Sequence, residues 1–298
     1  MKTKEFITTQ IISNTILLIL SLLALFPFLL LIIGSFTDNA AAVANGYTYF
    51  PEKWSLGAYE YILTQADYIL KAYLNTFFVT IAGTLVSLLI TSMFGYVLSV
   101  SELPGRRLLM FMCIFTMLFN GGIVSTYFVY SNVIHIKNTI FALIVPGLLM
   151  NAFTVMLFRN YYVSSVSTAL QEAARLDGAG EFFIYFKVVV PLSKPIIATI
   201  ALMSGLGYWN DWTNGLYYLT DRGGSHLYTI QIIMNKMNEN IAFLANNASK
   251  LTGVSVADLP STTIRMAIAV IGILPILVAY PFFQKYFVKG ISIGAVKG

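Results

Sequence analysis

The sequence predicts an all-α integral membrane protein with six transmembrane helices. Apolar residues make up 57% of the 298 positions and charged residues only 10%, whereas an ordinary soluble domain is about 25% charged. The apolar residues gather in runs of roughly 20 residues, which is the length that a helix needs to cross the hydrocarbon core. Because these runs are continuous, they exclude a β-barrel, whose strands alternate apolar and polar residues.

Six segments have this length and composition, and they are the predicted spans: 11–35, 74–100, 107–130, 139–158, 195–217 and 264–284. The first run follows Lys2 and Lys4 and so resembles a secretory signal. However, its apolar part exceeds the roughly 7–15 residues of a signal core, and further spans follow. The run is therefore predicted to be the first transmembrane helix.

The basic residues predict the orientation of these spans. If both termini face the cytoplasm, the inner segments hold 11 of the 18 Lys and Arg residues: Lys2, Lys4, Arg106, Arg107, Arg159, Arg175, Lys187, Lys194, Lys285, Lys289 and Lys297. The outer segments 36–73 and 218–263 are longer, and their cations are diluted among acidic residues. The positive-inside rule therefore places both termini in the cytoplasm.

The composition also argues against several classes of function. A net charge of +5 without any basic run does not suit a nucleic-acid-binding protein. Cys113 is the single cysteine, and His135 and His226 are far apart in the chain, so no metal site is expected. The chain has no Gly-x-x-x-x-Gly-Lys-Ser/Thr string to bind ATP. We therefore expect this chain to bind no cofactor and to catalyse no covalent reaction.

The inner segment 159–194 is too long for a simple connector, and its pattern predicts a helix, a turn and a second helix. Thr168 followed by Gln171 fits a capping box at the start of the first helix. Gly178 can take the positive φ that a tight turn requires. The second helix is predicted from about residue 179 to 189.

One face of the first of these helices suits contact with another protein. Spacings of three and four residues place Leu170, Ala173, Ala174 and Asp177 on one face. The small alanines let another surface approach the backbone closely. The second helix carries four aromatic side chains that are suited to fill a groove: Phe182, Phe183, Tyr185 and Phe186.

The same loop contains a recognisable motif, in which Glu-Ala-Ala is followed by three residues, Gly, nine residues and an aliphatic-x-aliphatic-Pro ending. It occupies Glu172 to Gly178 and Val188 to Pro191. This pattern resembles the signature loop of the inner-membrane permeases of binding-protein-dependent ABC importers. The resemblance is to the carbohydrate branch, of the maltose type, and within it to the lipoprotein-linked oligosaccharide subgroup.

The resemblance continues over nearly the whole chain, in the stretches Tyr208–Trp212, Ser261–Ala267 and Gln284–Gly290. Two departures concern the loop itself. The family usually has Pro and Glu near Ser167 and Ala169, and it has Ile and Leu where this chain has valines before Pro191. These departures affect the detail of the first loop helix rather than the resemblance as a whole.

The resemblance implies a type I ABC importer permease-like fold in the bacterial cell (inner) membrane. It implies a core at residues 72–284, preceded by a segment 1–71 with the first helix and followed by a cytoplasmic tail 285–298. The coupling helix would dock on a separate ATPase subunit through Glu172, Ala173, Ala174, Asp177 and Gly178. The implied partners are a second homologous permease, two ATPase subunits that bind ATP and Mg, an extracytoplasmic solute-binding lipoprotein, a sugar substrate and membrane lipid.

Polar residues within the fifth span are candidates for the substrate path. An ionisable residue in a span indicates a functional site, and aromatic faces with amide and carboxylate groups suit a sugar. The candidates are Tyr127, Trp209, Asn210, Asp211, Trp212 and Asn214. The alternative is that Asp211 lies near the outer interface and binds a backbone amide, with the tryptophans in the aromatic belt.

The C-terminal end and the low charge of the spans give two further expectations. The ending from Lys289 to Gly298 resembles the tail by which one maltose-type permease reaches between the ATPase subunits, and its glycines permit an extended insertion. An ion-coupled secondary carrier is the main alternative function. It predicts inverted repeats and buried carboxylate relays, whereas Asp211 is almost the only charge inside the predicted spans.

Overall fold

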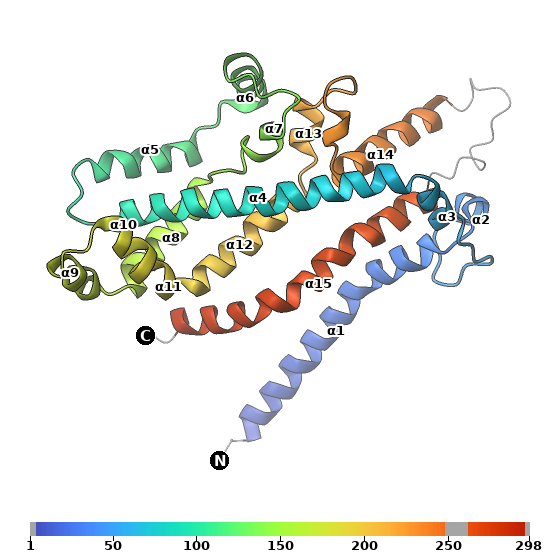
Figure 1. Ribbon diagram of the computed structural model, residues 1–298. Coiled ribbons are helices and arrows are strands. Elements are labelled where there is room, and N and C mark those ends of the chain that lie inside the picture. Colours follow the sequence, from blue (N-terminus) through green and yellow to red (C-terminus); the bar gives the residue numbers. More distant parts are fainter. Residues whose placement is uncertain (1–3, 248–261, 296–298) are drawn as a thin grey trace. The chain divides into compact units, whose positions relative to one another are not determined.

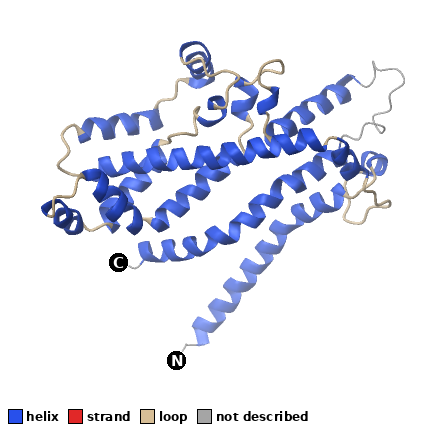
Figure 2. Cartoon of the chain, viewed as in Figure 1, coloured by secondary structure: helices blue, strands red, loops and turns tan. Residues whose placement is uncertain are grey.

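The computed structural model describes residues 4–247 and 262–295, and its named elements there are all helical (Figure 2). In chain order they are α1 (Lys4–Ser35), α2 (Asn39–Asn45), α3 (Gly57–Thr64), α4 (Ala66–Ser99), α5 (Arg106–Leu118), α6 (Gly122–Phe128), the π-helix η1 (Val129–Val133), α7 (Phe141–Ile144), α8 (Ala152–Ser165), α9 (Thr168–Leu176), α10 (Glu181–Ile184), the π-helix η2 (Tyr185–Val189), α11 (Val190–Leu192), α12 (Lys194–Trp209), α13 (Thr213–Tyr218), the 3₁₀-helix η3 (Ser225–Leu227), α14 (Ile230–Asn247) and α15 (Thr262–Ala295). The chain divides into two compact units, residues 1–69 with 234–276 and residues 70–233 with 277–298.

The first unit begins with α1, and side-chain hydrogen bonds fix the turn that follows this helix. The Ser35 hydroxyl lies 2.8 Å from the Tyr59 hydroxyl of α3. The Asp38 carboxylate accepts the amide hydrogen of Ala41 and pairs with the Lys53 ammonium at 3.2 Å. This pairing lowers the pKa of the Asp38 carboxyl. Because Asp38 caps free amide groups, α2 begins directly after it.

In the second unit, α4 presents a buried side of small residues spaced four or seven apart. They are Ala72, Thr76, Gly83, Ser87, Thr91 and Gly95. A Cβ added to Gly83 would lie 2.7 Å from the ring of Tyr208 in α12, and one added to Gly95 would lie 2.6 Å from the Cβ of Phe158 in α8. The small residues therefore let α8 and α12 approach α4 closely, as small residues do between helices in membranes.

Three helices in the described part of the chain are long and apolar enough to cross a membrane: Thr8–Ser35, Ala66–Ser99 and Thr262–Phe282. Two more candidates are helix pairs bent at a short break, Arg106–Leu118 with Gly122–Val133 at 119° and Glu181–Leu192 with Lys194–Trp209 at 84°. The described residues thus provide three spans, or up to five if each bent pair counts as one.

The prediction of one transmembrane helix over 107–130 is wrong, because the helix is interrupted at a glycine. Helix α5 ends at Leu118, and Gly122 has a φ of 77°. The Asn120 side-chain oxygen accepts the Gly122 amide hydrogen at 2.8 Å. A side chain thus satisfies a backbone group that the broken helix leaves without a helical partner.

The prediction of a continuous fourth helix over 139–158 is also wrong. Helix α7 ends at Ile144 and α8 begins only at Ala152. Pro146 lies between them and has no amide hydrogen to continue a helix. Asn151 then caps α8 by accepting the amide hydrogen of Phe153 at 2.8 Å.

The last two predicted spans differ from the structure at their ends. The fifth, predicted over 195–217, is helical only to Trp209 and resumes as α13. The sixth lies within α15, which continues to Ala295. The predicted extended tail is therefore wrong for 289–295, which are helical, and 296–298 lie outside the described residues.

Candidate functional site

The long inner loop folds as the predicted helix, turn and second helix. Helix α9 runs from Thr168 to Leu176, and the second helix consists of α10 and η2. Gly178 has a φ of 84°, which confirms the predicted left-handed turn, and its amide donates to the Arg175 carbonyl at 3.0 Å. The capping box is not formed, because Ser167 stands at the N-cap without a side-chain hydrogen bond and Gln171 is buried.

Most of the predicted coupling residues lie on the exposed side of the loop. Glu172, Ala173, Asp177 and Gly178 are exposed, while Ala174 is half-buried and packs against the apolar core of the second unit. Two large apolar side chains of α9 are exposed as well, Leu170 at 51% and Leu176 at 90%. Leu170 and Leu176 are six positions apart and so point to different sides of α9.

The second helix is divided between a buried and an exposed side. Ile184, Tyr185 and Val189 are buried in a cluster that also contains Tyr96 of α4 and Phe158 of α8. The other three aromatic residues singled out in the sequence are exposed: Phe182, Phe183 and Phe186. Tyr185 therefore anchors the loop to the spans, whereas its three aromatic neighbours remain accessible.

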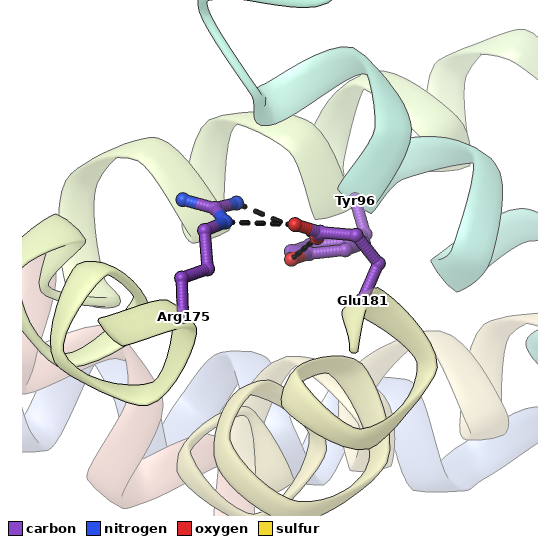
Figure 3. Close-up of polar contacts among 3 residues, drawn as sticks. All are labelled: Tyr96, Arg175 and Glu181. Atoms are coloured by element: carbon purple, nitrogen blue, oxygen red, sulfur yellow. Dashed lines mark hydrogen bonds and ion pairs between the residues drawn. The ribbon is translucent and has the colours of Figure 1, made fainter. Parts of the chain in front are cut away.

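An ion pair closes the turn between the two helices, and a tyrosine from α4 joins it (Figure 3). The Arg175 Nε donates to Glu181 Oε1 at 2.7 Å, and its Nη2 donates to Oε2 at 3.4 Å. The Tyr96 hydroxyl donates to the same Oε2 at 2.8 Å. The pKa of the Glu181 carboxyl is lowered because Arg175 and Tyr96 both donate to the carboxylate.

The contact between Tyr96 and Glu181 was not predicted from the sequence. Tyr96 and Glu181 are 85 positions apart, so no local pattern connects them. The one local signal was the pair of opposite charges on either side of Gly178, at Arg175 and Glu181.

The polar residues proposed for the substrate path are placed at the break between α12 and α13. Asp211 Oδ1 accepts the amide hydrogens of Thr213 at 3.1 Å and Asn214 at 3.3 Å, so the carboxylate stabilises the start of α13. Trp209 is buried and packs edge-to-face on Phe77 at 5.1 Å between ring centroids. This geometry agrees with the structural alternative for Asp211, a carboxylate bound by backbone amides.

The remaining path candidates have different surroundings. Asn210 is exposed and donates to its own helix at the Leu206 carbonyl, and Trp212 is 42% exposed. The Tyr127 hydroxyl accepts a hydrogen bond from the Lys137 ammonium at 2.8 Å. The Tyr127 ring stacks on Tyr218 at 5.7 Å.

A cavity of about 840 Å³ lies in the second unit where the helix breaks meet. Its lining includes Asn120 and Gly122 at one break, Pro146 at the next, and Asn214 and Tyr218 of α13. The Asn214 side chain donates to the Pro146 carbonyl at 3.0 Å and so ties α13 to the second break. Of the predicted path residues, Asn214 lines this cavity, whereas Tyr127 and Trp209–Trp212 do not.

Non-helical backbone at membrane depth is tolerated where it is buried in protein or lines a water-filled cavity. Asn120, Gly122 and Pro146, which lie at two of the breaks, line this cavity. Among the described residues, no group of three or more His, Cys, Asp or Glu side chains is placed to hold a metal ion.

Comparisons with known proteins agree with the motif of the inner loop. The family described as "Binding-protein-dependent transport system inner membrane component" matches residues 92–293. The polygalacturonan/rhamnogalacturonan transport system permease protein YtcP of Bacillus subtilis is 36% identical over 95% of this chain and 96% of its own length. The arabinooligosaccharides transport system permease protein AraQ of Halalkalibacterium halodurans is 29% identical over 94% of this chain and 93% of its own.

A solved structure is similar over almost the same extent. It is a chain of a bacterial ABC transporter involved in the import of the acidic polysaccharide alginate, with a TM-score of 0.78 and 29% identity. The match covers 96% of this chain and 99% of that one. The similarity therefore includes α1 and the C-terminal helix as well as the loop that carries the motif.

Proposed function

Because the chain belongs to the family of binding-protein-dependent transport system inner membrane components, we propose that it forms, together with a second permease, the path by which a sugar or oligosaccharide enters the cell. The chain is the permease subunit of an ABC importer and is not itself catalytic. Two ATPase subunits supply the energy, and an extracytoplasmic binding protein delivers the substrate. Similarity over 95% of the chain to a permease named for the transport of polygalacturonan and rhamnogalacturonan supports an oligosaccharide as the cargo.

The coupling residues of this subunit are Glu172, Ala173, Ala174, Asp177 and Gly178. The single observation that supports this assignment is the exposure of the motif residues Glu172, Ala173, Asp177 and Gly178 in and after α9, next to the exposed Leu170. ATP-driven closure changes transport only if the ATPase binds the inward- and outward-facing permease with different free energies. A rigid helix that docks on the ATPase provides such a difference. Glu172 then faces a cationic group there, because charge-assisted hydrogen bonds are stronger than neutral ones.

We further propose six spans with both termini in the cytoplasm. Three of the spans are the long helices at Thr8–Ser35, Ala66–Ser99 and Thr262–Phe282. The bent pair α5 and α6 makes another, α7 and α8 together make another, and α12 with α13 makes the one that follows the inner loop. Residues 72–284 form the permease core and 285–298 the cytoplasmic end. The imbalance of Lys and Arg between inner and outer segments supports this orientation.

The substrate path follows the break between α12 and α13, with Trp209, Asn210, Asp211, Trp212 and Asn214 beside it. Tyr127 adjoins it through its contact with Tyr218, a residue that lines the cavity of the second unit. The aromatic and amide groups suit the C–H faces and hydroxyl groups of a sugar ring.

Transport by purified components tests the function. The complex is purified through a tag on this chain, placed in vesicles and supplied with labelled oligogalacturonides and arabinooligosaccharides, each with its binding protein. We expect uptake of at least one of these sugars to require ATP, both permeases and the ATPase. Uptake by this chain alone, driven by an ion gradient, would instead establish a secondary carrier.

The Gly178→Asp variant tests the coupling residues. A side chain at this left-handed position strains the backbone by about 1–2 kcal/mol and adds a charge to the docking face. We expect the variant to insert normally but to lose ATPase association or uptake. Gly180→Asp is the matched control, because Gly180 is equally exposed but has an ordinary extended conformation with a φ of −73°. Full association and full uptake by Gly178→Asp would refute the coupling assignment.

A further inference from the structure

Two hydrogen bonds connect α4 to the second loop helix with matched spacing. Ser92 and Tyr96 lie one turn apart on α4, and Tyr185 and Glu181 lie one turn apart on η2 and α10. The Ser92 and Tyr185 hydroxyl oxygens are 2.5 Å apart, and the Tyr96 hydroxyl donates to Glu181 at 2.8 Å. The Ser92–Tyr185 bond and the Tyr96–Glu181 bond are one helical turn apart along both helices. Together they fix both the position and the rotation of the loop helix on α4.

Packing supports the same connection. Tyr96 and Tyr185 are both buried, and their rings are 5.5 Å apart between centroids. The Ser92–Tyr185 bond is buried as well. A satisfied buried hydrogen bond is costly to break, because each group would lose its partner away from water. Thus α4 and the second loop helix are joined firmly. Figure 1 shows α10 beside the C-terminal end of α4.

The first loop helix, α9, makes fewer apolar contacts with α4 and the second loop helix. Of the residues around the turn, Ala174 and Ala179 pack against the core cluster, and each contributes a single methyl group. Glu172, Ala173 and Asp177 are exposed. The Arg175–Glu181 ion pair connects α9 to α10 across the turn, and the same Glu181 carboxylate accepts a hydrogen bond from Tyr96.

Resting on the proposed function, we infer that Tyr96, Glu181 and Arg175 are positioning residues that carry the displacement of α9 into α4. Arg175 transmits the position of the docked helix to Glu181. The carboxylate then holds the Tyr96 hydroxyl, so that the loop and the second span move together. These residues bind neither the sugar nor ATP. They act on transport through the geometry of the loop.

The decisive variant is Tyr96→Phe, which removes one hydroxyl and keeps the aromatic ring. Ring contacts with Tyr162 and Tyr185 remain, as does the Arg175–Glu181 pair. In vesicles containing the full importer, we expect normal assembly and continued ATP hydrolysis. The labelled sugar imported per ATP hydrolysed should fall about fivefold or more, which is the lower range of typical allosteric coupling.

Tyr161→Phe is the matched control, because its hydroxyl also donates to a group of the loop, the Leu192 carbonyl at 3.3 Å, but has no bond to Arg175 or Glu181. We expect its import-to-hydrolysis ratio to equal that of the unaltered protein. A Tyr96→Phe complex with an unaltered ratio would overturn the inference. Loss of the assembled complex in Tyr96→Phe would also overturn it, since the hydroxyl would then serve stability rather than coupling.

Exchange of the two charges gives an independent test. Arg175→Glu and Glu181→Arg should each lower the import-to-hydrolysis ratio, because like charges then face one another across the turn. The double variant restores an ion pair across the turn and should recover part of the import-to-hydrolysis ratio. Recovery should be incomplete, because position 181 is then an arginine and cannot accept the hydrogen bond from Tyr96. A double variant no better than either single variant would count against the inference. If the unaltered chain binds no ATPase, the proposed function fails instead.

Discussion

At the scale of single residues, Gly178 is constrained by its backbone rather than by its neighbours. Its φ is 84°, and no atom lies within 4 Å of the position that a Cβ would take. In this chain a side chain would therefore meet open space. The constraint at this position comes from the left-handed turn that separates α9 from α10.

Serine substitutions at two neighbouring glycines isolate this effect. We expect Gly178→Ser to weaken co-purification of the ATPase, because the left-handed conformation disfavours a residue with a Cβ by about 1–2 kcal/mol. Gly180→Ser should remain near normal, since Gly180 is an extended N-cap residue and serine is favoured there. Equal co-purification by the two variants would show that the turn conformation is unimportant.

The Arg175–Glu181 pair predicts a defined response to pH. The folded-state pKa of Glu181 is lowered, so the stability contributed by this group is present above its unfolded pKa and is lost as pH falls through the folded pKa. The unfolded value is about 4.3. The charged and titratable neighbours are Arg175, Tyr96 and Glu102, which line one hollow with Glu181.

We therefore expect the difference in Tm between the unaltered protein and Glu181→Gln to stay constant from about pH 8 to pH 6. The difference should shrink only below the ordinary carboxyl range, and thermal unfolding in detergent at several pH values measures it. A difference that changes across neutral pH would contradict the lowered pKa.

At the scale of elements, the break between α5 and α6 depends on one of two adjacent glycines. Gly121 has an ordinary helical φ of −68°, whereas Gly122 has a φ of 77°. We expect Gly122→Ala to destabilise the protein by about 1–2 kcal/mol. Gly121→Ala should be neutral or slightly stabilising, because alanine fits that conformation. Comparing the Tm values of the two variants tests the expectation, and equal loss at both positions would contradict it.

Hydropathy located most elements, but it did not locate the breaks within them. The first, second and sixth predicted spans coincide with apolar helices, and the inner loop contains the predicted short helix, although its N-cap is Ser167 and not the predicted Thr168. The segments 107–130 and 139–158 are predominantly apolar, so averaging the hydropathy over a span hides a bend set by single residues such as Gly122 and Pro146. Helix ends that depend on one φ or one capping side chain carry little signal in an averaged profile.

The parts of the candidate site that are formed by neighbouring residues in the sequence were predictable. The motif from Glu172 to Gly178 occupies consecutive positions, and it predicted both the turn and the exposed face. The cavity and the Tyr96–Glu181 contact join residues from distant parts of the sequence. Such contacts arise from packing, for which a single sequence holds no direct record.

At the scale of the whole molecule, the orientation in the membrane can be tested with introduced cysteines. Cys113 is the only native cysteine and is buried, so background labelling should be low. We expect an impermeant thiol reagent to label Glu239→Cys from outside intact cells and Ser164→Cys only after the cytoplasmic face is opened. Both native side chains are exposed. Reversed accessibility would contradict the proposed topology.

The isolation of α1 bears on how the protein is made. None of its most apolar stretch is buried by the rest of the chain. A helix satisfies its own backbone groups in lipid, so α1 needs no later segment to remain in the bilayer. It also leaves the ribosome before α4. Insertion of this helix can therefore be complete before α4 has been synthesised, and the lysines at its N-terminal end can set the direction in which every later span is threaded.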